Sequence, residues 1–137
     1  MNFENKLISG EFVKRYKRFF VDVKIKNELI TAHCPNTGSM QGLLKEGNKV
    51  WLTKTTNPKR KLKYTLQFIE VNNSKVGINT HITNKIFLEA LKENKIKNFD
   101  KDINIKSEVK FGNNTRFDFL IINKKYKAFI EVKNVTL

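Results

Sequence analysis

The sequence has 137 residues, of which 39% are hydrophobic and 11 are Phe, and its formal net charge is +14. This length and apolar content suffice for one ordinary domain or two small ones and exclude global disorder. No apolar run approaches the roughly 20 residues of a membrane helix, no secretory signal pattern opens the chain, and a single Cys excludes an internal disulfide, so we expect a cytoplasmic protein that does not enter membranes.

Positive charge is spread over the whole sequence. Residues 1–80 contain 15 Lys and Arg against 6 Asp and Glu, and residues 81–137 contain 12 against 7. Such an excess attracts polyanions, most commonly nucleic acid. Lys outnumbers Arg 23 to 4, which is typical of compositional drift, but drift does not account for the excess over acids. We therefore predict a nucleic-acid partner.

Residues 1–80 show the pattern of a small β domain. Apolar residues alternate at Phe19, Val21, Val23 and Ile25, and further strand-like runs read "ELITAHC", "NKVWLTKT", "KYTLQFIEV" and "SKVGINT". Turn-forming segments, "PNTGSMQG" and "NPKRKLK", separate them. The count and spacing predict a five-stranded OB-like β-barrel over residues 1–80.

The run "KRYKR" is a candidate nucleic-acid contact. On a strand, Lys14, Tyr16 and Arg18 would share one face, and Arg15 and Lys17 the other. A basic strand with an aromatic can follow a nucleic-acid backbone and stack a base. The alternative is an edge strand kept soluble by its charge.

A second basic run lies in the segment "NPKRKLKYT". It places Lys59, Arg60, Lys61 and Lys63 on a loop that contains a proline. A cationic loop on a barrel is suited to phosphate contacts. The alternative is an exposed polar turn.

The segment "HCPNTGSM" is interpreted as a turn. His33 and Cys34 are adjacent, so on a strand they point to opposite faces and cannot act as a nucleophile and base pair. Pro35 and Gly38 favour a tight turn, and Cys34 is expected to be buried.

Residues 81–137 have a different pattern. "TNKIFLEALKENKI" has apolar residues at helical spacing, with Thr83 or Asn84 as the expected N-cap. Three strand-like runs follow: "INIKSEVKF", "RFDFLII" and "YKAFIEVK". The second half therefore predicts a helix followed by a three-stranded meander.

Two carboxylates and a lysine stand in the last two of these strands. Glu131 and Lys133 would share one face, and a hairpin would bring Asp118 beside them. Two adjacent carboxylates repel unless a cation lies between them, and oxygen ligands with room for water suit Mg²⁺ or Mn²⁺. A nearby lysine would stabilise a phosphoryl transition state. The alternative is an ordinary cross-strand salt bridge on an exposed face.

The order of helix, strand, Asp strand and Glu-x-Lys strand resembles the core of the PD-(D/E)XK nuclease fold. In that fold the preceding helix often supplies another carboxylate, for which Glu89 is the candidate, and Glu108 is a further one. The ordinary alternative for Glu89 is a helix-surface pair with Lys85 or Lys92.

Six blocks of the sequence, in order, resemble the sugar fermentation stimulation protein A family: "RYKRFFVDV", "TAHCPNTGSMQGLL", "VWLTKTTNPKRKLKYTL", "VGINT", "GNNTRFDFLI" and "EVKNVTL". The resemblance implies an N-terminal OB-like barrel, a PD-(D/E)XK nuclease-like domain, DNA binding and a link to sugar (maltose) metabolism. Members of the family continue past this point, so we expect residues 81–137 to be a partial αβββ unit, truncated after the Glu-x-Lys strand.

Together these features predict a DNA-binding protein with a metal-dependent phosphodiester-cleaving site. Asp118 and Glu131, with Glu89, would hold Mg²⁺ or Mn²⁺, and Lys133 would position water and phosphate. One alternative is a non-catalytic DNA-binding regulator that uses a nuclease-like fold only for docking. A more remote one is a protein-interaction module.

Overall fold

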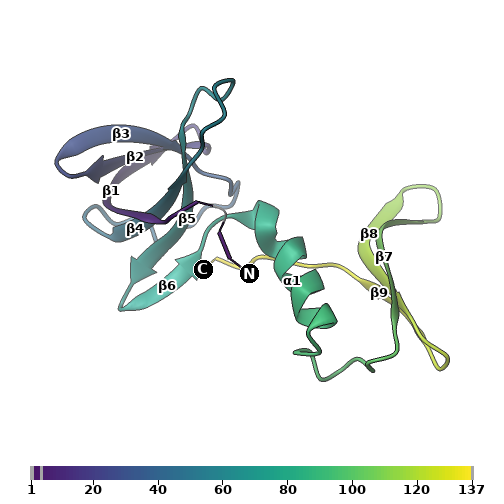
Figure 1. Cartoon of the computed structure of the whole chain (residues 1–137). Helices are drawn as coiled ribbons and strands as arrows, with labels where there is room; N and C mark the ends of the chain where they lie inside the picture. The colour runs from purple at the N-terminus through teal and green to yellow at the C-terminus, as the bar shows by residue number, and fades with distance from the viewer. Residues whose placement is uncertain (1, 4, 137) are drawn as a thin grey trace. The chain divides into compact units, whose positions relative to one another are not determined.

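The computed structural model describes residues 2–3 and 5–136, and these form two compact units (Figure 1). The first unit comprises Asn2–His81 together with Val135 and Thr136. The second comprises Ile82–Asn134.

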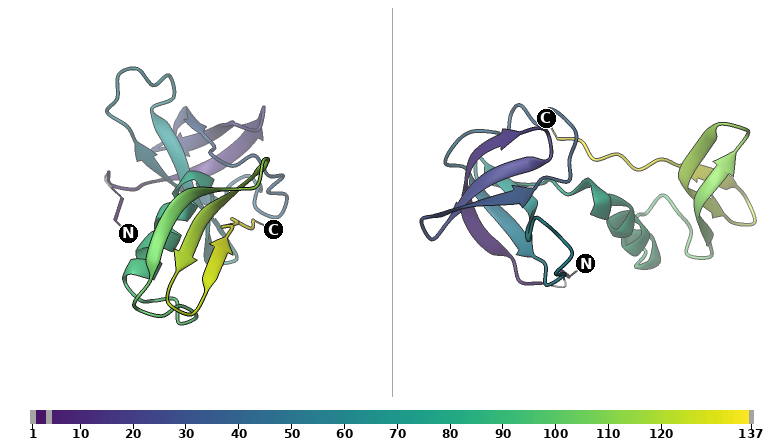
Figure 2. Two further views of the ribbon diagram at one scale, coloured as in Figure 1. Left: turned by 90° about the vertical axis from the view of Figure 1, so that its right-hand side faces the viewer. Right: turned by 90° about the horizontal axis from the view of Figure 1, so that it is seen from above.

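The first unit is a closed β-barrel. Its strands are β1 (Ile8–Tyr16), β2 (Phe20–Ile25), β3 (Glu28–His33), β4 (Lys49–Lys54), β5 (Tyr64–Val71) and β6 (Ser74–Gly77). Antiparallel pairing gives the order β3-β2-β1-β4-β5-β6, and a short parallel pairing of β3 with β5 closes the ring. The right-hand view of Figure 2 shows these strands curving into the barrel. The predicted OB-like fold is confirmed, with β6 added as a hairpin outside the ring.

Alternation along the strands fills the barrel interior. Val21 and Val23 of β2 and Ala32 of β3 are completely buried, because side chains two apart point to the same side of a strand. They pack with the interior residues of the other strands, which include Phe12, Val50, Leu52, Leu66 and Ile69. Burying each large side chain contributes about 1.5–3 kcal/mol, so this cluster is the main source of the unit's stability.

The second unit is a helix followed by a meander. The short 3₁₀ helix η1 (Thr80–Ile82) leads into α1 (Thr83–Lys92), and β7 (Asn104–Phe111), β8 (Thr115–Ile122) and β9 (Lys127–Ile130) form an antiparallel sheet in the order β7-β8-β9. Phe87 of α1 contacts Phe119 of β8, with ring centroids 5.3 Å apart. In the part of the chain that is described, no helix has the length and apolar character to cross a membrane.

Three local predictions were wrong. β1 ends at Tyr16, so Lys17 and Arg18 lie in the hairpin turn and not on strand faces. β9 ends at Ile130, so Glu131 and Lys133 follow the strand in an irregular segment. The N-cap position of α1 is Ile82 rather than Thr83 or Asn84.

Candidate functional site

Arg15 holds the barrel's β1–β2 turn against the segment that follows β3. Its guanidinium donates to the carbonyl of Asn36 at 2.6 Å, of Gly38 at 2.7 Å and of Ser39 at 3.3 Å. Its Nε donates to the carbonyl of Arg18 at 2.8 Å. These donors are engaged by the protein itself, so Arg15 is a structural clamp within the basic run.

The β1–β2 turn exposes two cations. Lys17 and Arg18 have φ values of 48° and 61°, a conformation that costs about 1–2 kcal/mol per residue for side chains other than glycine. Phe19 N–H donates to the Lys17 carbonyl at 2.7 Å, and Arg15 binds the Arg18 carbonyl. These bonds hold the turn in a single shape while both side chains remain exposed.

Asp22 organises the outer surface of the barrel beside this turn. Asp22 is 7% exposed, and its carboxylate accepts hydrogen bonds from Thr31 Oγ1 at 2.8 Å and Tyr16 Oη at 3.2 Å. Lys14 Nζ lies 3.8 Å from its other oxygen. The Asp22 carboxylate therefore has hydrogen-bond donors within the barrel surface, and the exposed Lys14 side chain lies beside it.

The loop between β4 and β5 is organised in a similar way. Lys63 Nζ donates to the carbonyls of Asn57 and Pro58, at 3.1 and 3.2 Å, and Arg60 donates to Thr65 Oγ1 at 3.1 Å. Lys59 and Lys61 are exposed. Of the four cations predicted to bind nucleic acid here, two hold the loop and two extend from it.

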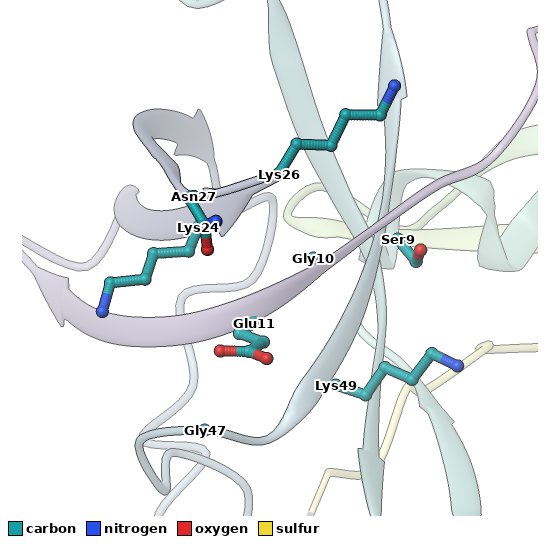
Figure 3. A pocket seen from close by; sticks show the side chains of 8 residues that line it. All are labelled: Ser9, Gly10, Glu11, Lys24, Lys26, Asn27, Gly47 and Lys49. Atoms are coloured by element: carbon teal, nitrogen blue, oxygen red, sulfur yellow. The ribbon is translucent and has the colours of Figure 1, made fainter.

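A pocket of about 370 Å³ opens on another part of the barrel (Figure 3). Three lysines and one carboxylate contribute to its lining, which consists of Ser9, Gly10, Glu11, Lys24, Lys26, Asn27, Gly47 and Lys49. The ammonium groups of the lysines point in different directions, and the Glu11 carboxylate lies among them. The pocket adds positive charge to the barrel but provides no single point at which a phosphate would be gripped.

His33 and Cys34 do not form a catalytic pair. Cys34 is fully buried, and burial raises the pKa of its thiol. Burial also lowers the pKa of His33, with smaller contributions from the charges of Arg60 and His81. The Gly38 N–H donates to Asn36 Oδ1 at 2.8 Å, as expected for the predicted turn.

In the second unit, Asp118 of β8 is the centre of the predicted metal site. Its Oδ1 accepts from Asn84 Nδ2 at 2.9 Å, and its Oδ2 accepts from the backbone N–H of Val132 at 2.7 Å. Asp118 is half-buried and lines a small pocket of about 160 Å³ with Asn84, Lys85, Leu88, Ser107, Glu108 and Phe119. The backbone of the Glu-x-Lys segment thus contacts Asp118 at Val132, whereas the meeting of the Asp118, Glu131 and Lys133 side chains on one strand face stays a prediction.

Glu131 and Lys133 lie on either side of Val132. Both are exposed, and Lys133 Nζ donates to Glu131 Oε1. This hydrogen bond and the Glu131 charge raise the pKa of Lys133, and the charge of Asp118 adds to the effect. Lys133 therefore stays protonated at neutral pH.

The other predicted carboxylates are separated. Glu89 lines a depression along α1 with Lys85, Lys92 and Glu93, and Glu108 pairs with Arg116 at 2.9 Å. Among the described residues, no three His, Cys, Asp or Glu side chains gather closely enough to hold a metal ion. Glu89, Asp118 and Glu131 therefore do not form a three-carboxylate set in this structure, and their roles as ligands stay predictions.

Sequence reasoning missed two contributors to this site. Asn84 was expected to cap the helix, yet its amide binds Asp118, and the amide of Val132 provides the second contact. A polar residue in the first turn of a helix has both options, and only the tertiary fold decides between them.

Two family models match this chain. The model described as the SfsA N-terminal OB domain matches residues 13–78, and the model described as the sugar fermentation stimulation protein RE domain matches residues 81–137.

Curated relatives show the same similarity. A sugar fermentation stimulation protein homolog of Pelagibacter ubique is 57% identical over the full chain, which spans 59% of that protein. A homolog of a Marinomonas species is 43% identical over the full chain, which spans 54% of it. The chain thus covers less than two thirds of the length of these relatives.

A solved structure agrees in fold. The structure of Pyrococcus furiosus SfsA in complex with Ca²⁺ superposes with a TM-score of 0.79 at 26% identity, over 96% of this chain and 55% of that one. The family models, the relatives and the shared fold lead to one conclusion: the chain belongs to the sugar fermentation stimulation protein family.

Proposed function

We propose that the chain binds nucleic acid, in the first instance DNA, through the cationic loops of its barrel. The proposal rests on a difference between the cations of each basic loop: some hold the loop in place, and others extend into solvent. Arg15 fixes the β1–β2 turn and Lys63 fixes the β4–β5 loop, so that Lys17, Arg18, Lys59 and Lys61 are held out in solvent. Cations on loops that are already ordered lose less entropy when they bind phosphates.

A matched pair of double variants tests this proposal. Lys17→Gln/Arg18→Gln removes two charges from the β1–β2 turn, and Lys124→Gln/Lys125→Gln removes two from the exposed β8–β9 turn of the second unit. Fluorescence anisotropy with a labelled oligonucleotide should show a clear loss of affinity for the first variant and a small change for the second. Equal losses would mean that only net charge matters and would contradict the assignment to the barrel.

A second candidate function is metal-dependent phosphodiester cleavage around Asp118. It is favoured by the contact between Asp118 and Val132, which brings the Glu131 and Lys133 segment to β8. The Pyrococcus furiosus protein was solved with Ca²⁺, a cation that takes oxygen ligands as Mg²⁺ and Mn²⁺ do. Asp118 and Glu131 carry such oxygens, and Glu89 of α1 is a further candidate. A bound metal would neutralise phosphate charge and activate water.

In this second candidate, the chain's own residues would act in distinct ways. Asn84 and the Val132 amide orient the Asp118 carboxylate, and protonated Lys133 provides a positive charge beside the substrate phosphate. Incubation of DNA and RNA with the protein and Mg²⁺ or Mn²⁺ tests the activity. Product that depends on metal and is lost in Asp118→Asn, but kept in the exposed Asp102→Asn, would support it.

Absence of any metal-dependent product would leave the non-catalytic alternative, a nucleic-acid-binding regulator.

The role in sugar utilisation that the family's name records is extended to this chain as part of the same proposal. It would be tested by deleting the coding sequence in its own host and measuring growth on maltose and on glucose.

A further inference from the structure

A row of rings crosses the outer surface of the barrel on three neighbouring strands. Tyr16 of β1 pairs directly with Phe20 of β2, and Phe20 pairs directly with His33 of β3. Residues in direct register have side chains on the same face, about 5 Å apart. The three rings therefore follow one another across the sheet, and we call this set, with the adjacent Phe19, the ring row.

The ring row points away from the core. The residues next to Phe20 and His33 in sequence, Val21 and Ala32, are fully buried in the barrel interior. Since successive side chains on a strand alternate between faces, Phe20 and His33 lie on the outer face. Tyr16 and Phe19 remain 37% and 45% exposed. Exposed aromatic rings grouped in this way are uncommon on surfaces that bind nothing.

The rings form two pairs, and within each pair the planes are nearly parallel. Tyr16 and Phe20 have centroids 5.5 Å apart and planes 13° apart. Phe19 and His33 have centroids 6.5 Å apart, again with planes 13° apart. Flat rings that present parallel faces provide the geometry on which nucleobases stack.

Hydrogen bonds fix the backbone that carries Phe19 and the ring of Tyr16. The Phe19 N–H donates to the Lys17 carbonyl at 2.7 Å, and the Cys34 N–H donates to the Phe19 carbonyl at 2.8 Å. The Tyr16 hydroxyl donates to buried Asp22. The rings are thus ordered before any ligand arrives, which lowers the entropic cost of stacking a base on them.

Cations border the ring row. Lys17 and Arg18 adjoin Phe19 in the turn, Lys14 lies 5.6 Å from the centre of the Tyr16 ring, and the Arg60 charge acts on His33. An apolar stripe with positive charge around it is complementary to a ligand with flat rings on a polyanionic backbone. An acidic peptide would match the charge but would not use the parallel rings.

We infer that the ring row stacks unpaired bases, so that the barrel binds single-stranded nucleic acid in preference to duplex. In a duplex the bases stack on one another and only their edges are accessible, so flat protein rings gain nothing from it. This inference rests on the proposed nucleic-acid binding and specifies which form of nucleic acid is recognised.

The test compares one strand alone with the same strand in a duplex. Tyr16→Leu and Phe19→Leu keep apolar bulk but remove a ring. Each should weaken binding to a labelled oligothymidine by at least about fivefold, because stacking contributes strongly per base, and should change duplex binding less than about twofold. Tyr16→Phe keeps the ring and loses only the hydroxyl contact with Asp22, so it should lose less single-strand affinity than Tyr16→Leu. Phe111→Leu, which removes a 53% exposed ring from the second unit, should bind like the parent.

The outcomes separate the two proposals. Equal losses on both nucleic acids, or no loss on the single strand, would overturn the stacking inference while leaving nucleic-acid binding intact. No salt-sensitive binding to either would overturn the proposed function itself.

A measurement on the unaltered protein tests the inference even if a variant fails to fold. A 5-bromouracil oligonucleotide crosslinked by ultraviolet light should attach within residues 16–20 or at His33, as located by mass spectrometry. Crosslinks confined to other segments would overturn the inference.

Discussion

The backbone N–H of Val132 donates a hydrogen bond to the Asp118 carboxylate across 2.7 Å. This contact brings the Glu-x-Lys segment to β8 although β9 ends at Ile130. The carboxylate therefore has a structural role in addition to any role as a metal ligand. Replacing it affects stability, so activity data on its variants must be read beside their unfolding data.

Asp118→Asn should lower the free energy of unfolding by about 1–3 kcal/mol. Asn84 and Val132 donate to different oxygens of the carboxylate, and an asparagine keeps an oxygen at only one of these two positions. Its NH₂ group would face a donor at the other. Urea unfolding measures the change, and exposed Asp102→Asn is the control. Equal stability of the two variants would contradict the described contacts.

Arg15→Lys should destabilise the barrel by about 1–3 kcal/mol although charge is conserved. A lysine ammonium cannot reproduce the fork of donors that reaches the Asn36, Gly38 and Arg18 carbonyls. Thermal unfolding followed by circular dichroism would detect the change. Lys17→Gln, in the exposed turn, should have little effect, and a loss as large as that of Arg15→Lys would argue against the clamp.

Gly10→Ala tests the packing of β1 against β2. A Cβ at Gly10 would lie 2.6 Å from Val23 Cγ1 and 2.7 Å from the Lys24 carbonyl, distances that force the strands apart. Overpacking of this kind costs about 1–3 kcal/mol. Gly77→Ala is the matched control, since a Cβ there meets nothing within 4 Å. Similar unfolding midpoints for the two variants would show that the strands separate at little cost.

The lowered pKa of His33 predicts acid sensitivity of the barrel. His33 binds a proton more readily in the unfolded state than in the folded state. The contribution of neutral His33 to the free energy of unfolding is therefore fully present above its ordinary pKa of 6.5. It is lost as the pH falls below 6.5 and through the folded pKa. Unfolding curves measured from pH 7.5 to 5 should show this decrease, and His33→Phe, which keeps a ring beside Phe19, should reduce it. An NMR titration that finds an unshifted His33 would contradict the assignment.

Much of the barrel could be predicted because apolar residues recur with a period of two along parts of its strands. Val21 and Val23 are interior, and Phe20 and Asp22 are on the outer face, as a period of two requires. The pairing of β3 with β5 closes the barrel and joins residues far apart in sequence, such as Ala32 and Tyr64. We predicted this closure from the number of strands, because no local sequence pattern indicates it.

Side-chain roles were harder to predict than elements. Arg15 and Lys17 are both basic residues of one run, yet Arg15 binds carbonyls and Lys17 is exposed, because the turn after Tyr16 directs them differently. Similarly, alternation placed Glu131 and Lys133 on a strand, but β9 ends first. Where a strand ends depends on pairing partners, which the residues themselves do not encode locally.

The central claim, that loop cations of the barrel bind nucleic-acid phosphates, is tested most directly by salt dependence. Dissociation constants for one duplex should be measured over a range of salt concentrations for the parent and for Lys59→Ala/Lys61→Ala. Each phosphate contact contributes about 0.9 to the slope of log affinity against log salt. The account predicts a steep slope for the parent that becomes shallower by about two in the variant. A slope in the variant equal to that of the parent, or a parent affinity that does not depend on salt concentration, would contradict the account.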